Sequence, residues 1–167
     1  MKPSTTEDAS QRLPSIARWL GFAGLLPQLL LVAALISEVS NSSFTAANLA
    51  LVYSALILSF LGGTWWGLAA RSAARVPLWI WLAAIATSLI GFAALAATVI
   101  GQEPRMSLYF VGGALIGALG VDFRLATTGM CPRGWLGLRV PLSLGLGGLT
   151  ILTDHGHVTE AIVGHLP

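Results

Sequence analysis

Long runs without a charged side chain divide this sequence, and they constrain its fold more than any other feature. A helix needs about 20 apolar residues to cross the hydrocarbon core of a bilayer, where its backbone must satisfy its own hydrogen bonds. Three of the runs reach this length, and the last two must take in flanking polar residues to do so. The five runs are Trp19 to Ser37, Val39 to Ala70, Val76 to Gln102, Met106 to Val121, and Val140 to Thr153.

The sequence therefore predicts an all-α, polytopic membrane protein, a bundle of five transmembrane helices at approximately 16–37, 46–70, 78–100, 106–125 and 136–153. Composition agrees, because 55% of the residues are hydrophobic and only 10% are charged, whereas soluble domains carry about 25% charged residues. We expect one transmembrane domain over residues 16–154. A flexible N-terminal tail over 1–15 and a short external C-terminal tail over 155–167 would flank it.

Basic residues lie almost entirely on one side of this predicted bundle. The positive-inside rule then places the N-terminus in the cytoplasm or its organellar equivalent, and five spans leave the C-terminus outside. The eight residues on the predicted inner side are Lys2, Arg12, Arg18, Arg71, Arg75, Arg124, Arg133 and Arg139, and only Arg105 lies on the outer side.

Several function classes find no support in the sequence. The basic residues are too dispersed for a nucleic-acid surface, and the single cysteine, Cys131, allows no intrachain disulfide. No nucleophile elbow, phosphate-binding loop or dinucleotide fingerprint is present, and a His-x-His pair on a short tail is a weak metal signal. We therefore expect no enzymatic activity, no catalytic residues, no cofactor and no metal site.

Small residues on the second predicted span indicate close helix packing. Ser59, Gly63 and Gly67 recur every four residues and so share one helix face, as in the small-xxx-small interfaces of membrane helices. Gly113 and Gly117 of the fourth span are the expected partners.

The tryptophans that follow this glycine face admit two interpretations. Trp65 and Trp66 lie shortly before Arg71, and all six tryptophans fall on the predicted inner side. They predict either an aromatic belt at the inner interface or an aromatic and basic vestibule for an anionic ligand. The orientation of each indole decides between these alternatives.

Polar residues at membrane depth are the remaining site candidates. An antiparallel hairpin of the last two spans would bring Asp122 and Arg139 to the same depth, where pairing lowers the cost of burying each charge. Such a pair serves either to hold the hairpin together or as part of a site. Gln28, directly after Pro27, would satisfy the backbone carbonyl that the proline leaves free, bond to a neighbouring helix, or contact a ligand.

These segments resemble a family of small membrane proteins related to mitochondrial transmembrane protein 69. The matching features are "LGFAGLLP" (Leu20 to Pro27), "YSALILSFLGGTWWG" (Tyr53 to Gly67), Asp122, and the pattern formed by Trp135, Leu138, Arg139, Leu142 and Ser143. Where that family often has a basic residue or histidine, this chain has Trp65. The resemblance implies a bacterial or mitochondrial inner-membrane location without an established activity, and it points to Trp66, Asp122 and Arg139.

Two functional hypotheses follow. The first is a non-catalytic accessory or assembly protein, with the lipid bilayer and a membrane protein complex or a second copy of the chain as partners. The alternative is a small-molecule or lipid binding or transport protein with a site at the inner leaflet. Its ligand-binding candidates are Trp65, Trp66, Arg71, Asp122, Arg139 and Gln28.

Overall fold

The computed structural model describes residues 14–36, 43–72, 75–101 and 104–153. The predicted C-terminal tail with its histidines, and all but the last two residues of the predicted N-terminal tail, lie outside this range. The regular elements are all helices. They are α2 (Ser15–Ala23), α3 (Leu26–Ile36), α4 (Ser43–Arg71), α5 (Leu78–Val99), α6 (Pro104–Thr127) and α7 (Trp135–Leu152).

Five of the resulting segments are long and apolar enough to cross a membrane, so the chain has the architecture of a multi-pass membrane protein. The two short apolar runs reach this length by extending into polar residues. The fourth segment continues past Asp122 to Thr127, and the fifth begins at Trp135. The five segments are Ser15–Ala34, Thr45–Arg71, Leu78–Val99, Pro104–Thr127 and Trp135–Leu152.

The first segment is interrupted between α2 and α3. Pro27 has no backbone N–H and tolerates only the first turn of a helix, so α3 begins anew at Leu26. The Tyr53 hydroxyl of α4 donates a hydrogen bond to the carbonyl oxygen of Gly24 at the break. A polar contact from a neighbouring helix thus satisfies backbone that the interruption exposes.

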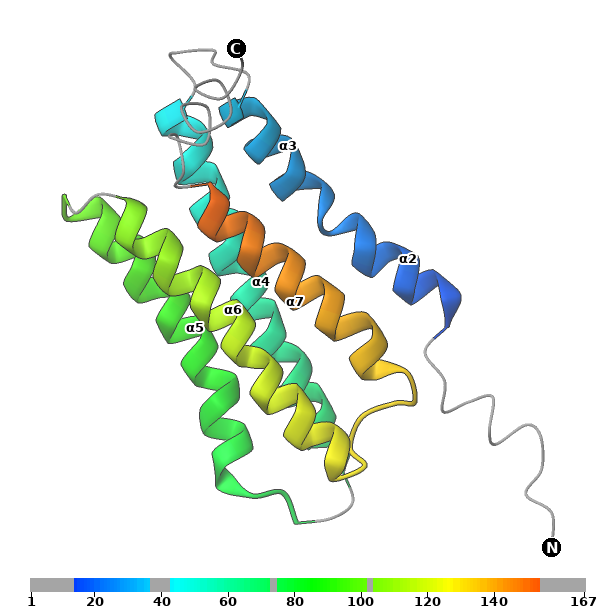
Figure 1. The fold of residues 1–167 in the computed structure, drawn as a ribbon. Coiled ribbons are helices and arrows are strands. Elements are labelled where there is room, and N and C mark those ends of the chain that lie inside the picture. The colour runs from blue at the N-terminus through cyan, green and yellow to red at the C-terminus, as the bar shows by residue number, and fades with distance from the viewer. Residues whose placement is uncertain (1–13, 37–42, 73–74, 102–103, 154–167) are drawn as a thin grey trace, which may run out of the picture.

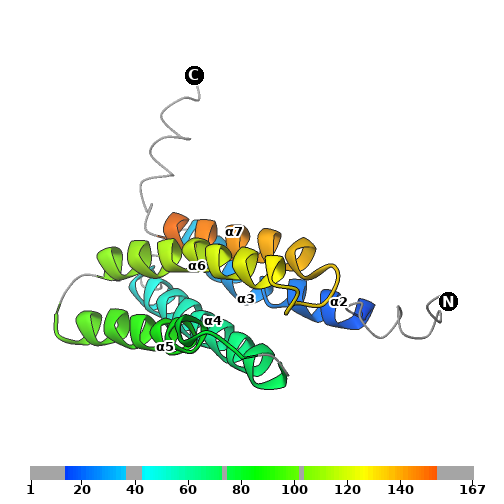
Figure 2. The same cartoon turned by 90° about the horizontal axis from the view of Figure 1, so that it is seen from below.

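The helices form two layers with α4 near the centre (Figures 1 and 2). In one layer α4 packs along α5, and in the other α6 packs along α7. Helix α6 also contacts both α4 and α5, while α3 packs on α4 and α7. The core between the layers contains Leu58, Ile80 and Leu115, each fully buried.

Glycines allow the closest helix contacts within each layer. A methyl group at Gly62 of α4 would clash with the Ala84 carbonyl and the Thr87 hydroxyl of α5. Between α6 and α7, a Cβ at Gly112 would lie 2.9 Å from the carbonyl oxygen of Gly147, and the reverse distance is also 2.9 Å. These backbones can approach so closely only because no side chain intervenes.

The glycines predicted for packing lie on other faces. An added Cβ at Gly63, Gly67, Gly113 or Gly117 would meet no atom within 4 Å, so their predicted pairing between the second and fourth spans is wrong within this chain. Successive helix positions differ by about 100°, and the packed face of α4 lies one residue earlier, at Gly62. Ser59 does contact a neighbour, since its hydroxyl lies 2.8 Å from that of Ser88 on α5.

Candidate functional site

A buried polar cluster joins three helices around Asp122. We call Trp65, Asp122, Trp135 and Arg139 the Asp122 cluster. Asp122 Oδ1 accepts hydrogen bonds from the indole Nε1 of Trp65 at 2.9 Å and of Trp135 at 3.1 Å. Its Oδ2 accepts one from Arg139 Nε at 2.9 Å and also lies 2.9 Å from Arg139 Nη2. The carboxylate therefore ties α4, α6 and α7 together.

The hairpin of α6 and α7 brings the two charges together as predicted, and the Asp122–Arg139 pair is confirmed. Gly129 and Gly134 in the connector have φ of 73° and 84°, a backbone conformation that glycine adopts without strain. Arg139 also lies over the Trp135 ring, 5.5 Å from its centroid. Three donors from α4 and α7 occupy both carboxylate oxygens, so the cluster is suited to holding the helices rather than to binding a ligand.

Adjacent tryptophans point in different directions. Trp65 is 1% exposed and faces Asp122, whereas Trp66 is 47% exposed and meets Trp81 of α5 edge to face, with ring centroids 4.7 Å apart. Trp66 therefore does not converge with Asp122 and Arg139. Trp135 was not among the predicted site residues. It lies four residues before Arg139 and therefore on the same helix face, and this spacing could have indicated its role.

Gln28 belongs to a second polar contact, away from the Asp122 cluster. Its Nε2 lies 3.4 Å from Thr150 Oγ1 of α7, and Ser54 Oγ of α4 lies 2.7 Å from the same oxygen. Gln28 is completely buried, and its Oε1 has no partner in the described part of the chain. Of the three predicted roles, the structure shows the bond between helices.

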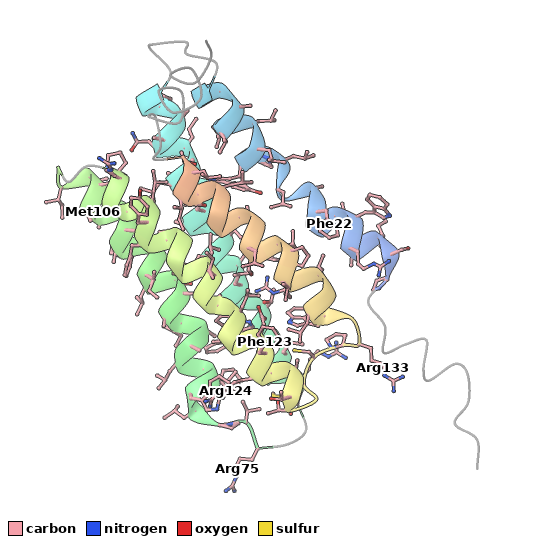
Figure 3. The ribbon with its side chains drawn as sticks, in the orientation of Figure 1. Phe22, Arg75, Met106, Phe123, Arg124 and Arg133 are labelled. Atoms are coloured by element: carbon pink, nitrogen blue, oxygen red, sulfur yellow. The ribbon has the colours of Figure 1, made fainter. Side chains whose placement is uncertain are left out.

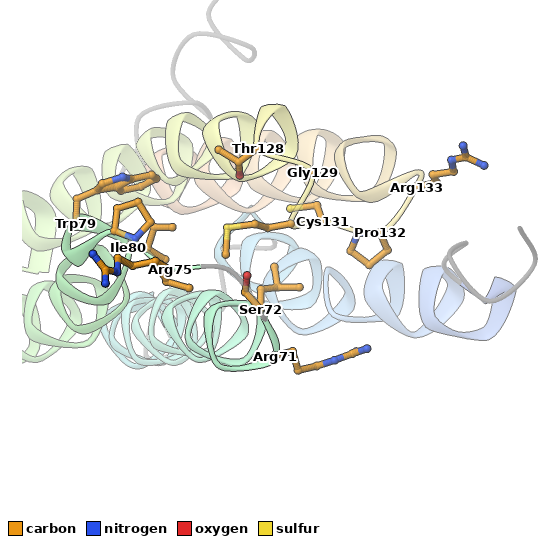
Figure 4. A pocket seen from close by; sticks show the side chains of 14 residues that line it. Arg71, Ser72, Arg75, Trp79, Ile80, Thr128, Gly129, Cys131, Pro132 and Arg133 are labelled. Carbon is orange, nitrogen blue, oxygen red and sulfur yellow. The ribbon is translucent and has the colours of Figure 1, made fainter. Parts of the chain in front are cut away.

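A cavity of about 690 Å³ opens at the end of the bundle where α4 ends and α5 begins, facing the connector between α6 and α7 (Figure 4). Ser72 and Thr128 point toward each other across it, and Cys131 also lines it. Of the predicted ligand residues, only Arg71 lines this cavity. Its lining residues are Leu68, Arg71, Ser72, Arg75, Val76, Pro77, Trp79, Ile80, Thr128, Gly129, Met130, Cys131, Pro132 and Arg133.

The cavity is strongly basic. Arg71, Arg75 and Arg133 contribute to its wall, and Asp122 is the only acidic residue within the described ranges. That carboxylate is already paired with Arg139. The amino end of α5 adds positive potential, because the first N–H groups of a helix have no partners within the helix. The N-cap residue, Pro77, makes no side-chain hydrogen bond to them. Arg75 and Arg133 were not predicted as site residues, although the sequence places both in connectors between the charge-free runs.

Cys131 lines the cavity and lies within the electrostatic influence of Asp122 and Arg139. Burial, and secondarily the negative charge of Asp122, raise the pKa of the Cys131 thiol to about 11, although the positive charge of Arg139 acts in the opposite direction. The thiol is therefore protonated at neutral pH and a poor nucleophile. Among the residues that the structure describes, no three His, Cys, Asp or Glu side chains group together as metal ligands would.

Comparison with known proteins identifies one family. A family model described as "Protein of unknown function (DUF3429)" matches residues 13–153. No curated protein and no solved structure matches the chain.

Proposed function

The chain belongs to the DUF3429 family of unknown function, and we propose that it is a non-catalytic membrane protein that binds an anionic amphipathic molecule. One observation carries this proposal. The cavity of about 690 Å³ is lined by Arg71, Arg75 and Arg133 together with apolar side chains. Its size falls within the range of about 300 to 1,000 Å³ that is typical of small-molecule sites.

The arrangement of charges supports a site at the inner leaflet. Arg75, Arg124 and Arg133 lie at one end of the bundle, opposite Met106 (Figure 3). In our proposal this end and the N-terminus both face the inside, following the positive-inside rule. The membrane in this proposal is a bacterial cytoplasmic membrane. The resemblance to the transmembrane protein 69-like family supports an inner-membrane location.

The chemistry of the buried groups supports binding rather than catalysis. Both oxygens of the Asp122 carboxylate already accept hydrogen bonds, and the pKa of Cys131 is raised to about 11. Neither group is poised to act as a general base or nucleophile near neutral pH.

Binding of an anionic detergent tests this proposal. The full-length protein in a neutral detergent is titrated with dodecyl sulfate below denaturing concentrations, and binding is measured by native mass spectrometry. Arg71→Gln and Arg75→Gln should each weaken binding by about tenfold, as expected for losing one charged hydrogen bond. Arg124→Gln is the matched control, because Arg124 is exposed but does not line the cavity. Equal binding by all variants would exclude the site.

An accessory or assembly role is the second candidate, and the exposed glycines favour it. Gly63 and Gly67 of α4, and Gly113 and Gly117 of α6, have open space where a Cβ would lie. Such faces let another transmembrane helix approach closely, from a second copy or a membrane complex. Gly63→Leu and Gly113→Leu should reduce association measured by crosslinking in native membranes. Unchanged crosslinking in both variants would argue against this role.

A further inference from the structure

We propose that the cavity holds the headgroup of an anionic phospholipid, with its phosphodiester at Arg71, Arg75 and the amino end of α5. This inference rests on the proposed binding function and names its ligand class. The observations that carry it are the division of the cavity lining into polar and apolar parts, the type of its cations, and its position at the end of the bundle.

The lining matches an amphipathic ligand. Its polar groups are the arginines and the hydroxyls of Ser72 and Thr128, while an apolar set borders them. An inorganic anion alone would leave the apolar part of the wall unused. A phosphate with attached glycerol and acyl carbons would contact both parts. The apolar set comprises Leu68, Val76, Pro77, Trp79, Ile80 and Met130.

The cations suit a phosphate. Every basic residue within the described ranges is an arginine, and a guanidinium binds phosphate oxygens through two parallel hydrogen bonds. Arg71 reaches outward at the rim, and Arg75 lies beside the start of α5 (Figure 4). Both side chains are exposed and free to turn toward a ligand.

The start of α5 provides a further anion-binding element. This 22-residue helix follows Pro77, and its N-cap makes no side-chain hydrogen bond. Pro77, Trp79 and Ile80 all line the cavity, so the positive end of the helix is at its wall. A phosphate there would interact with the helix dipole as well as with the arginines.

The position of the cavity favours a lipid as the source of the phosphate. It lies at the end of membrane-spanning segments, where basic pockets between transmembrane helices meet phospholipid headgroups. Trp79 is half-buried in its wall, and indoles are favoured at this depth.

The test compares three probes on the full-length protein in a neutral detergent. These are dioctanoyl phosphatidylglycerol, dioctanoyl phosphatidylcholine and inorganic phosphate. Native mass spectrometry measures binding, and alkylation of Cys131 by N-ethylmaleimide reports occupancy, because Cys131 is the only cysteine and lines the cavity. Phosphatidylglycerol should bind about tenfold more tightly than phosphatidylcholine and slow the alkylation. Arg75→Gln should remove this preference, and Arg124→Gln should retain it.

The other outcomes separate this inference from the broader proposal. If inorganic phosphate protects Cys131 as well as phosphatidylglycerol does, the site takes an aqueous anion and the lipid inference fails. If the two lipids bind equally while dodecyl sulfate still requires Arg75, the ligand class is wrong but the anionic site stands. If neither Arg71→Gln nor Arg75→Gln affects any probe, both proposals fail.

Discussion

Asp122 Oδ2 of α6 lies 2.9 Å from Arg139 Nη2 of α7, and the Asp122 carboxylate has no exposed surface. A buried ion pair of this kind contributes little net stability but is very sensitive to the loss of one partner. Because Trp65 of α4 bonds to the same carboxylate, the ion pair stabilises the packing of α4, α6 and α7 together. The connector from α6 to α7, which forms one wall of the cavity, begins just beyond it.

Asp122→Asn should destabilise the protein by about 3 to 5 kcal/mol, because Arg139 would be left buried without a counter-charge. Thermal unfolding in a fixed detergent measures this loss. The double variant Asp122→Asn with Arg139→Gln should be more stable than the sum of the single losses predicts. Strict additivity would mean that the two side chains do not interact.

Trp65→Phe should cost about 1.5 to 3 kcal/mol, since it removes a hydrogen bond to a charged group in the interior. Trp66→Phe is the adjacent control. Its side chain is 47% exposed and makes an edge contact with Trp81, so the free energy of unfolding should change little. Equal losses in the two variants would contradict the assignment of Trp65 to the Asp122 cluster.

Gly62→Ala should strongly destabilise the packing of α4 on α5, because its Cβ would collide with the Ala84 carbonyl. Gly63→Ala, one residue later, introduces the same methyl group into open space. It should be neutral or stabilising by up to about 1 kcal/mol, the difference in helix propensity. Melting temperatures of the two variants provide the measurement. A larger loss for Gly63→Ala would contradict the assignment of Gly62 to the face of α4 that packs on α5.

Gln28→Leu should be nearly neutral, because the loss of the long 3.4 Å contact from Gln28 Nε2 to Thr150 is offset by the removal of a buried acceptor that lacks a partner. Thr150→Val should be more destabilising, because both Gln28 and Ser54 contact the Thr150 hydroxyl. Chemical unfolding of both variants provides the measurement. A larger loss for Gln28→Leu would indicate that Gln28 Oε1 has a partner in the membrane.

Alkylation of Cys131 by iodoacetamide should be slow at pH 8 and rise about tenfold per pH unit until the thiol titrates. The sign follows from its pKa of about 11 against a reference of 9.0, since below the pKa the reactive thiolate is a minor fraction that grows about tenfold per pH unit. The unfolded protein should react about 100-fold faster at pH 8. A folded-state rate already saturated at pH 8 would contradict the raised pKa.

Much of the architecture follows from local features of the sequence. Charge-free runs predict helices because lipid offers the backbone no other hydrogen-bond partner. Within the described ranges, five segments are long and apolar enough to span a membrane, and five were expected. The pairing of Asp122 with Arg139 was also predictable. An antiparallel hairpin fixes which positions share a depth, and a buried charge strongly favours an opposite charge beside it.

The tertiary structure decided which face of each helix is packed. Gly62 and Gly63 are neighbours of the same residue type, as are Trp65 and Trp66, yet one of each pair is buried and the other is exposed. Lipid is as apolar as the protein interior, so hydrophobicity does not distinguish the two faces. The cavity likewise joins Arg71 and Arg75 to a connector more than 50 positions away, and only the packing of α4 and α5 against α6 and α7 creates that proximity.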